Sequence, residues 1–188
     1  MTTTAATQAK PLTAGDLLRL YSEGVRGELI RGELCETMPT GHEHGRIVVN
    51  LVVEMKNFVK PRRLGTLTAS DSGVWLERNP DTVRAPDIAF FSAEKMPSGS
   101  RVTGYSEVVP DLVVEVASPG DSPREINDKA LMWLGFGVQF ALVVRPETRS
   151  VDVHRRGHPV LTLGENDTLD NIDVLPRFAC AVKDVFDD

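Results

Sequence analysis

Apolar runs separated by short polar breaks predict a chain built mainly of strands with two longer helices. The run Leu112–Ala117 is apolar and β-branched, as is typical of a strand covered on both faces. Apolar residues at helical spacing over 42–59 predict a helix that Pro61 ends. A second helix is predicted over 124–134, and a largely apolar strand over 138–144 follows it.

Shorter elements surround this strand–helix–strand unit. They are a helix over 13–23 capped by Thr13, a hairpin over 27–37, strands over 66–70, 73–77, 88–91, 150–155, 160–163 and 172–175, and a closing segment over 182–186. The polar stretch 92–106 is predicted to be a flexible flap or a partly disordered loop. A strand–helix–strand unit implies a parallel crossover in a mixed sheet with a helix packed on it. We therefore expect one α/β domain over 13–188 after a disordered leader over 1–12.

Composition adds limits to this fold. Hydrophobic residues make up 41% and charged residues 26% of the 188 residues, which is ordinary for a soluble globular protein. Cys35 and Cys180 show no metal-ligand or disulfide spacing, so a cytoplasmic location is expected. No apolar run approaches the length of a membrane span, and the N-terminus lacks the apolar core of a secretory signal. The formal net charge of −6 argues against a surface coated with phosphate-binding side chains, although a small basic groove and a nuclease remain compatible with it.

Glu115 interrupts the central apolar run with a carboxylate. A buried carboxylate is costly unless a cation or a hydrogen-bond donor meets it, so its partner is either a basic side chain or a metal ion. Asp87 opens a neighbouring predicted strand, and adjacent strands about 4.8 Å apart could bring both carboxylates to one divalent ion. Mg²⁺ suits such a pair because it prefers oxygen ligands and retains several waters. The alternative is that Asp87 caps a turn and Glu115 forms an internal ion pair.

Two further residues bear on this pair. Asp111 lies on the same strand as Glu115, but four extended residues separate them by about 13 Å, too far for one small ion. We therefore expect Asp111 to have a structural role at the start of the strand. Lys129 lies on the helix after the Glu115 strand, where its long side chain could reach back over the strand end and polarise a water molecule. A solvated position on the helix face is the alternative for Lys129.

These residues resemble the PD-(D/E)xK nuclease superfamily, which has the restriction-endonuclease-like fold, and within it the Uma family of restriction endonucleases. The resemblance rests on Glu28–Leu34 in the hairpin, His44–Ile47, Ala85–Ala89, Pro110–Pro119, and Lys129 with Gly137-Val138. Each piece is weak alone, whereas their order and spacing over most of the chain make the combination fairly specific.

The resemblance implies roles for individual residues. Asp87 and Glu115 would bind Mg²⁺ (or Mn²⁺), and Lys129 would be the catalytic lysine, because Ala117 stands at the usual lysine position two residues after the glutamate. Glu28 and His44 match polar positions that flank the site. For Glu28 an exposed place in the hairpin, like that expected of Glu33, is the alternative, and for His44 a solvent-facing place on its helix.

The chain also departs from the family at two positions. Arg145 stands where relatives often have an aspartate, and Trp133 stands where a tyrosine is common. Neither change removes an expected ligand, but both could alter the packing around the site.

Three interpretations are consistent with these observations. The first is a Mg²⁺-dependent endonuclease acting on nucleic acid, with DNA the expected substrate and a homodimer expected by fold-level analogy. The second is a catalytically silent nuclease fold that serves as a binding or assembly module, which the acidic pI of 5.3 favours. The third is a structural ion pair between Glu115 and an arginine, with no active site.

Overall fold

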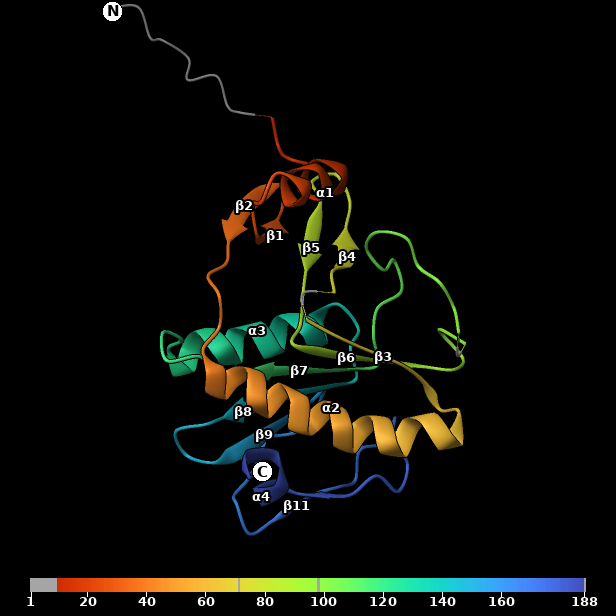
Figure 1. The fold of residues 1–188 in the computed structure, drawn as a ribbon, viewed down its shortest axis with the longest axis vertical. Helices are drawn as coiled ribbons and strands as arrows, with labels where there is room; N and C mark the ends of the chain where they lie inside the picture. Colours follow the sequence, from red (N-terminus) through yellow and green to blue (C-terminus); the bar gives the residue numbers. More distant parts are fainter. Residues whose placement is uncertain (1–9, 71, 98, 188) are drawn as a thin grey trace, which may run out of the picture.

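A six-stranded mixed sheet lies at the centre of the molecule, with helices on both faces (Figure 1). The computed structural model describes residues 10–70, 72–97 and 99–187. The strand order of this six-stranded sheet, here called the main sheet, is β10-β9-β8-β7-β6-β3. Its strands are β3 (Gly65–Ala69), β6 (Ile88–Ser92), β7 (Leu112–Val116), β8 (Phe140–Arg145), β9 (Ser150–Arg155) and β10 (Leu161–Leu163). Strands β7 and β8 are parallel, and α3 (Pro123–Gly135) connects them, as the sequence predicted. The other neighbours in this main sheet pair antiparallel.

Alternate side chains of the main sheet enter two different cores. Leu112, Val114 and Val116 of β7 pack in the core beneath α2 (His42–Arg62), together with the C-terminal β11 (Thr168–Leu169), β12 (Cys180–Ala181) and α4 (Val182–Phe186). Val113 packs in the opposite core with Trp133 of α3. The uninterrupted apolar run of β7 therefore reflects burial on both faces, as expected for a central strand.

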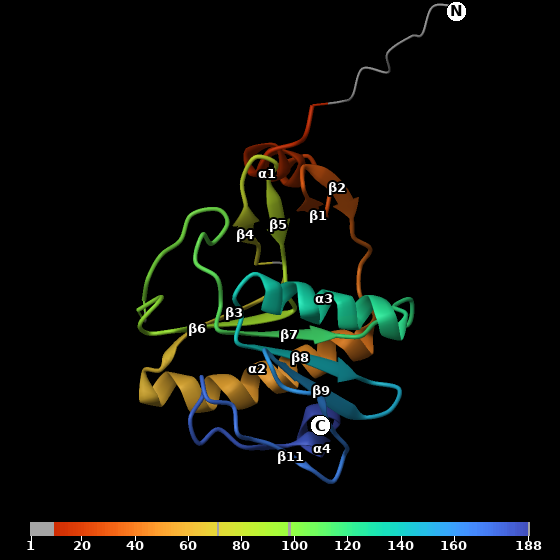
Figure 2. The ribbon, with the colours of Figure 1, turned by 180° about the vertical axis from the view of Figure 1, so that it is seen from behind.

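A smaller sheet stands at one end of the main sheet and carries the N-terminal helix (Figures 1 and 2). Its order is β2-β1-β5-β4, formed by β1 (Gly27–Ile30), β2 (Glu33–Glu36), β4 (Val74–Glu77) and β5 (Thr82–Arg84). Helix α1 (Ala14–Ser22) covers it, and Thr13 caps this helix by accepting a hydrogen bond from the Asp16 amide. Ala14, Leu17, Leu29 and Val83 form the separate small core between them.

Several predicted boundaries differ from the structure. Helix α2 runs through Pro61 and ends at Arg62, because a proline in the last turn removes only one intrahelical hydrogen bond. The strand predicted over 172–175 is wrong: Ile172 and Leu175 are buried, but they lie in a turn closed by the Leu175 amide and the Ile172 carbonyl. The three-residue strand β5 was not predicted, and the closing segment over 182–186 is a short helix.

The last residue of the loop over 92–106 forms backbone hydrogen bonds with the edge of the small sheet. The Ser106 amide donates to the Gly73 carbonyl at 3.0 Å, and the Trp75 amide donates to the Ser106 carbonyl at 2.8 Å. At the N-terminus, the Leu12 amide donates to the Gly32 carbonyl at 2.9 Å. Residues 1–9 of the predicted leader lie outside the described residues. No described helix combines the length and the apolar character that crossing a membrane requires.

Candidate active site

Asp87 lies where the chain passes from the small sheet into the main sheet. It follows β5 and directly precedes β6, whose Ile88 pairs with Val114 of β7. Continuing this antiparallel register by one residue places Asp87 opposite Glu115. The Oδ2 atom of Asp87 accepts a hydrogen bond from the Val116 amide at 2.7 Å, which fixes the carboxylate beside the end of β7.

Glu115 is 1% exposed, and both of its carboxylate oxygens meet donors from α3. Lys129 Nζ lies 2.7 Å from Oε2, and the indole Nε1 of Trp133 donates to Oε1 at 2.6 Å. Lys129 and Trp133 are four residues apart, so they project from the same side of the helix toward β7. The structure therefore gives Glu115 an ion-pair partner, which is a lysine and not the arginine considered from the sequence.

Burial and neighbouring charge determine the protonation of this pair. Burial raises the pKa of Glu115 to about 7, the charge of Lys129 opposes this rise, and the charge of Asp87 adds to it. Burial alone would lower the pKa of Lys129, but the negative charges of Glu115 and then Glu28 raise it above its ordinary value. Lys129 thus remains an ammonium ion at neutral pH, while Glu115 would be more readily ionised if a second cation lay beside it.

His44 lies in the first turn of α2 and is 8% exposed, so the solvent-facing alternative does not hold for it. Its Nε2 atom lies 3.2 Å from Asp87 Oδ2. The hydrogen bond with Asp87 raises the pKa of His44 above its ordinary value, against the opposing effect of burial. His42, two residues earlier, is exposed.

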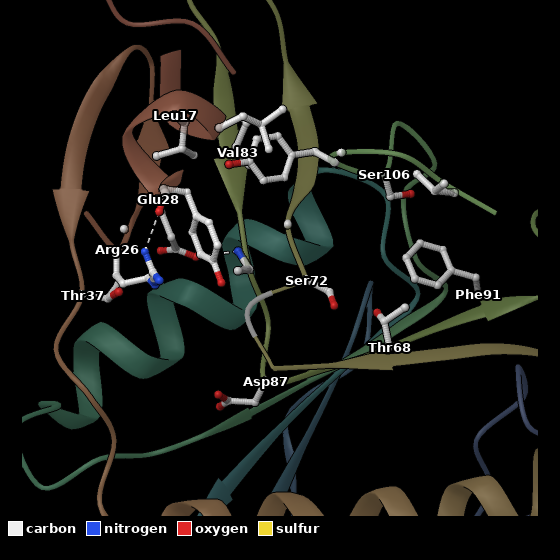
Figure 3. A pocket seen from close by; sticks show the side chains of 18 of the residues that line it. Leu17, Arg26, Glu28, Thr37, Thr68, Ser72, Val83, Asp87, Phe91 and Ser106 are labelled. Atoms are coloured by element: carbon white, nitrogen blue, oxygen red, sulfur yellow. Dashed lines mark hydrogen bonds between the residues drawn. The ribbon is translucent and has the colours of Figure 1, made fainter. Parts of the chain in front are cut away.

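Glu28 is brought to the same region from β1 of the small sheet. Arg84 Nε forms an ion pair with Glu28 Oε2 at 2.9 Å, and the Ala85 amide donates to Oε1 at 2.7 Å. The carboxylate is thus half-buried and held against the segment that leads to Asp87, while Glu33 in the same hairpin is exposed. Figure 3 shows Glu28 above Asp87 on the wall of a pocket that both residues line.

Asp111 lies apart from these residues, at the opposite end of β7. It is 2% exposed and pairs with Lys95 Nζ at 2.8 Å. It also accepts hydrogen bonds from the Ser92 amide at 2.8 Å and from Gln139 Nε2 at 2.9 Å. These contacts tie the end of β6 and the loop after it to β7, which is a structural role.

Asp87, Glu115, Lys129 and His44 open onto one cleft of about 740 Å³, here called the acidic cleft. Its walls carry six carboxylates and the cations Arg84 and Lys129. The six are Glu36, Asp87, Glu115, Asp121, Glu125 and Asp128. Such a surplus of negative charge repels a phosphate unless a cation is bound with it.

The oxygen-rich chemistry of the cleft fits a hard divalent cation. Asp87 and Glu115 are neighbouring carboxylates at a strand end, and within the described residues both contacts of the Asp87 carboxylate fall on Oδ2. Among the described residues, no group of three or more histidine, cysteine or acidic side chains could enclose an ion. Two carboxylates with retained water suit Mg²⁺, whereas a structural zinc site would need a closed set of nitrogen or sulfur ligands.

Two residues that contact the candidate site residues were not predicted to have a role in the site. Trp133 was seen only as a departure from the family pattern, although its position four residues after Lys129 is the signal that places both on one helix face. Arg84, the partner of Glu28, lies in the short strand β5 that the sequence analysis missed. Arg145, the other departure, has its own partners: it donates to Asp152 at 2.7 Å and to Asn127 at 2.9 Å.

Comparisons with known proteins identify the family and the fold. The family named Uma2 and described as "Putative restriction endonuclease" matches residues 14–183. The chain is also similar to a crystal structure described as "a putative nuclease belonging to DUF820" from Anabaena variabilis, with 22% identity and a TM-score of 0.78. That match covers 94% of this chain and 98% of the other. No curated protein matches the chain.

The two matches differ in what they establish. At 22% identity the likeness to the Anabaena variabilis protein concerns the fold, and it confirms the expected restriction-endonuclease-like α/β architecture. The family match covers most of the chain, including every candidate site residue. The protein described here therefore belongs to the Uma2 family of restriction-endonuclease-like proteins.

Proposed function

We propose that the protein is a Mg²⁺-dependent endonuclease that hydrolyses phosphodiester bonds of DNA in the acidic cleft. Asp87 and Glu115 are the proposed metal ligands, and Mn²⁺ would serve in place of Mg²⁺. A divalent ion held there would neutralise a phosphate oxygen and lower the pKa of a bound water. The observation that carries the proposal is the convergence of these two carboxylates with Lys129 at the end of β7.

The other residues have roles that follow from their contacts. The ammonium group of Lys129 would stabilise negative charge that develops on the phosphate, as preorganised donors do in other hydrolases. His44 and the Val116 amide hold the Asp87 carboxylate in place through contacts of 3.2 and 2.7 Å. Glu28, through the Ala85 amide, fixes the segment that carries Asp87.

Cleavage of DNA in Mg²⁺ by purified variants tests this proposal. Asp87→Asn and Glu115→Gln should each abolish cleavage and weaken Mn²⁺ binding measured by calorimetry, because each removes one anionic ligand. Glu33→Gln, an equally small change at an exposed carboxylate, should alter neither readout. A wild-type protein that binds no divalent ion, or Asp87→Asn protein that cleaves at the wild-type rate, would disprove the metal site.

A catalytically silent binding or assembly module is the second candidate. It is favoured by the ion pair between Glu115 and Lys129, which already neutralises the buried carboxylate within the protein. This candidate predicts partner association that neither EDTA nor Glu115→Gln abolishes. The homodimer expected by analogy stays a prediction for both candidates, and sedimentation of the full chain tests it.

A further inference from the structure

A second cavity, here called the side pocket, adjoins the acidic cleft. It has a volume of about 380 Å³, within the range of small-ligand sites. Asp87 and Lys129 line both spaces, so a substrate whose phosphate lies in the cleft can extend directly into the side pocket. The walls come from α1, the small sheet, the edge of the main sheet and the loop over 92–106, as Figure 3 shows for Leu17, Val83 and Phe91.

Two tyrosines give the side pocket aromatic walls. Tyr21 of α1 is 50% exposed, and the Arg26 guanidinium lies 3.8 Å from the centre of its ring. Tyr105 is half-buried in the loop over 92–106. Burial and then the proximity of Tyr21 raise the pKa of Tyr105, so its phenol stays neutral. Neutral aromatic faces beside an arginine are the surfaces on which nucleobases stack.

The position of Tyr105 is fixed before any ligand binds. A Cβ atom added to Gly73 would lie 2.4 Å from Cδ1 of Tyr105, so the ring rests directly on the glycine backbone. The next residue, Ser106, forms backbone hydrogen bonds with Gly73 and Trp75 of the small-sheet edge. A ring held in this way loses little further freedom when a base stacks on it.

The remaining lining combines exposed apolar surface with hydrogen-bonding groups. Leu18 and Val102, together with Tyr21, are large apolar side chains that the fold leaves exposed, and all three line the side pocket. Thr37, Thr68 and the carboxylate of Glu28 add donors and acceptors. A base has an apolar face and a polar edge, and this lining offers partners for both.

The charge of the protein supports a base-binding role. The net charge of −6 argues against a surface that neutralises many phosphates, which is how long duplexes are bound. Stacking on aromatic side chains supplies affinity without that neutralisation. We propose that the side pocket binds one unstacked nucleobase of single-stranded DNA next to the phosphate held in the acidic cleft. This inference rests on the proposed nuclease function and adds to it the strandedness of the substrate.

Binding of fluorescently labelled DNA, measured by anisotropy in Ca²⁺, tests the inference. We expect a single strand to bind more tightly than a blunt duplex of the same sequence. Tyr105→Ala should weaken single-strand binding by about 5- to 150-fold, the usual effect of removing one stacking ring, and Tyr105→Phe should restore it. Tyr21→Ala should also weaken binding, and because Tyr21 lies half exposed this variant keeps the packed interior unchanged.

An abasic position moved along the strand identifies the base involved. At one position the missing base should weaken binding to wild type at least as much as Tyr105→Ala does, and it should cost less in that variant than in wild type. Val160→Ala, at an exposed apolar residue that lines neither space, is the matched control. Equal binding of duplex and single strand, no binding of either, or no effect of the abasic positions would overturn the inference.

These experiments distinguish a failure of the side-pocket inference from a failure of the proposed nuclease function. Mg²⁺-dependent cleavage that is lost in Glu115→Gln but is insensitive to Tyr105 and to abasic positions would remove the side-pocket inference and leave the nuclease. Base-dependent binding without cleavage would support the side pocket and remove the nuclease.

Discussion

Lys129 Nζ lies 2.7 Å from Glu115 Oε2, so the lysine proposed for catalysis is also the counter-ion of a proposed metal ligand. The metal-free site is therefore not an uncompensated buried charge, which would be unstable. A divalent ion entering the acidic cleft would share Glu115 with Lys129. The ammonium would then be placed close to whatever the ion holds, which is where a catalytic cation is useful.

Removing the ammonium should separate its catalytic role from its structural role. We expect Lys129→Met to reduce DNA cleavage at saturating Mg²⁺ by about 100-fold or more, the usual cost of losing a transition-state donor. Lys56→Met, at an exposed position of α2, should leave the rate unchanged. Wild-type rates in Lys129→Met would mean that Lys129 serves only as the counter-ion of Glu115.

Trp133 is expected to position Glu115 without touching the substrate. Trp133→Phe keeps most of the buried ring but removes the hydrogen bond to Oε1, so the free energy of unfolding without metal should fall by about 1–3 kcal/mol. The Mn²⁺ affinity measured by calorimetry should fall by about tenfold, as for other residues that orient metal ligands. Trp75→Phe is the matched control because Trp75 Nε1 donates to the Glu77 carbonyl, and its metal affinity should equal that of wild type.

Asp111 should behave as a structural acid. Burial would raise its pKa, but Lys95 and Ser92 more than compensate and hold the pKa of Asp111 below its ordinary value. The stability that this carboxylate contributes is therefore present above the ordinary aspartate pKa and is lost as the pH falls through the folded value. We expect Asp111→Asn to lower the free energy of unfolding in urea by about 2 kcal/mol, equally with and without Mg²⁺. A selective loss of metal binding in this variant would contradict the assignment.

His154 gives the fold a second pH dependence that is independent of the site. It is buried, its ring nitrogens have no hydrogen-bond partner among the described residues, and burial lowers its pKa against the opposing charge of Asp152. The unfolded chain therefore binds the extra proton first, and stability falls as the pH drops below about 6.5, by up to about 1.4 kcal/mol per pH unit.

Urea unfolding at a series of pH values measures the contribution of His154. His154→Phe should remove this contribution, so the stability of the variant should fall less than that of wild type between neutral pH and mildly acidic pH, because the side chain at position 154 can no longer take up a proton. The same change at His158, which is exposed, should leave the slope as it is in wild type. Parallel curves for wild type and His154→Phe would show that His154 is protonated equally in both states.

Elements with long runs or a regular spacing of apolar residues were predictable from the sequence, and short elements that depend on tertiary contacts were not. The β7–α3–β8 unit was predicted because its apolar runs are continuous and its helix is bounded by Pro123 and Gly135. Strand β5 was missed because three residues are too short to show a period. The segment over 172–175 is mostly apolar, as a short strand would be, yet Ile172 and Leu175 are buried from a turn.

Only the part of the site that local sequence patterns and the family resemblance indicate could be predicted. The buried carboxylate in β7 was recognisable because it interrupts an apolar run. Asp87 and Lys129 were candidates from their predicted places beside that strand, and the resemblance to the family gave them roles. The contacts of Glu28 with Arg84 and Ala85 depend on the pairing of β1 with β5, which brings together residues more than fifty positions apart. No local pattern in the sequence reports such a pairing.

The junction at Asp87 makes the two sheets mechanically dependent on each other. Ala85 is anchored to Glu28 of the small sheet, and two residues later Asp87 is anchored to Val116 of the main sheet. A tilt of the small sheet would therefore pull directly on one of the two carboxylates and change the span between them. Any ligand that wedges the sheets apart would therefore disturb the proposed metal site without entering the acidic cleft.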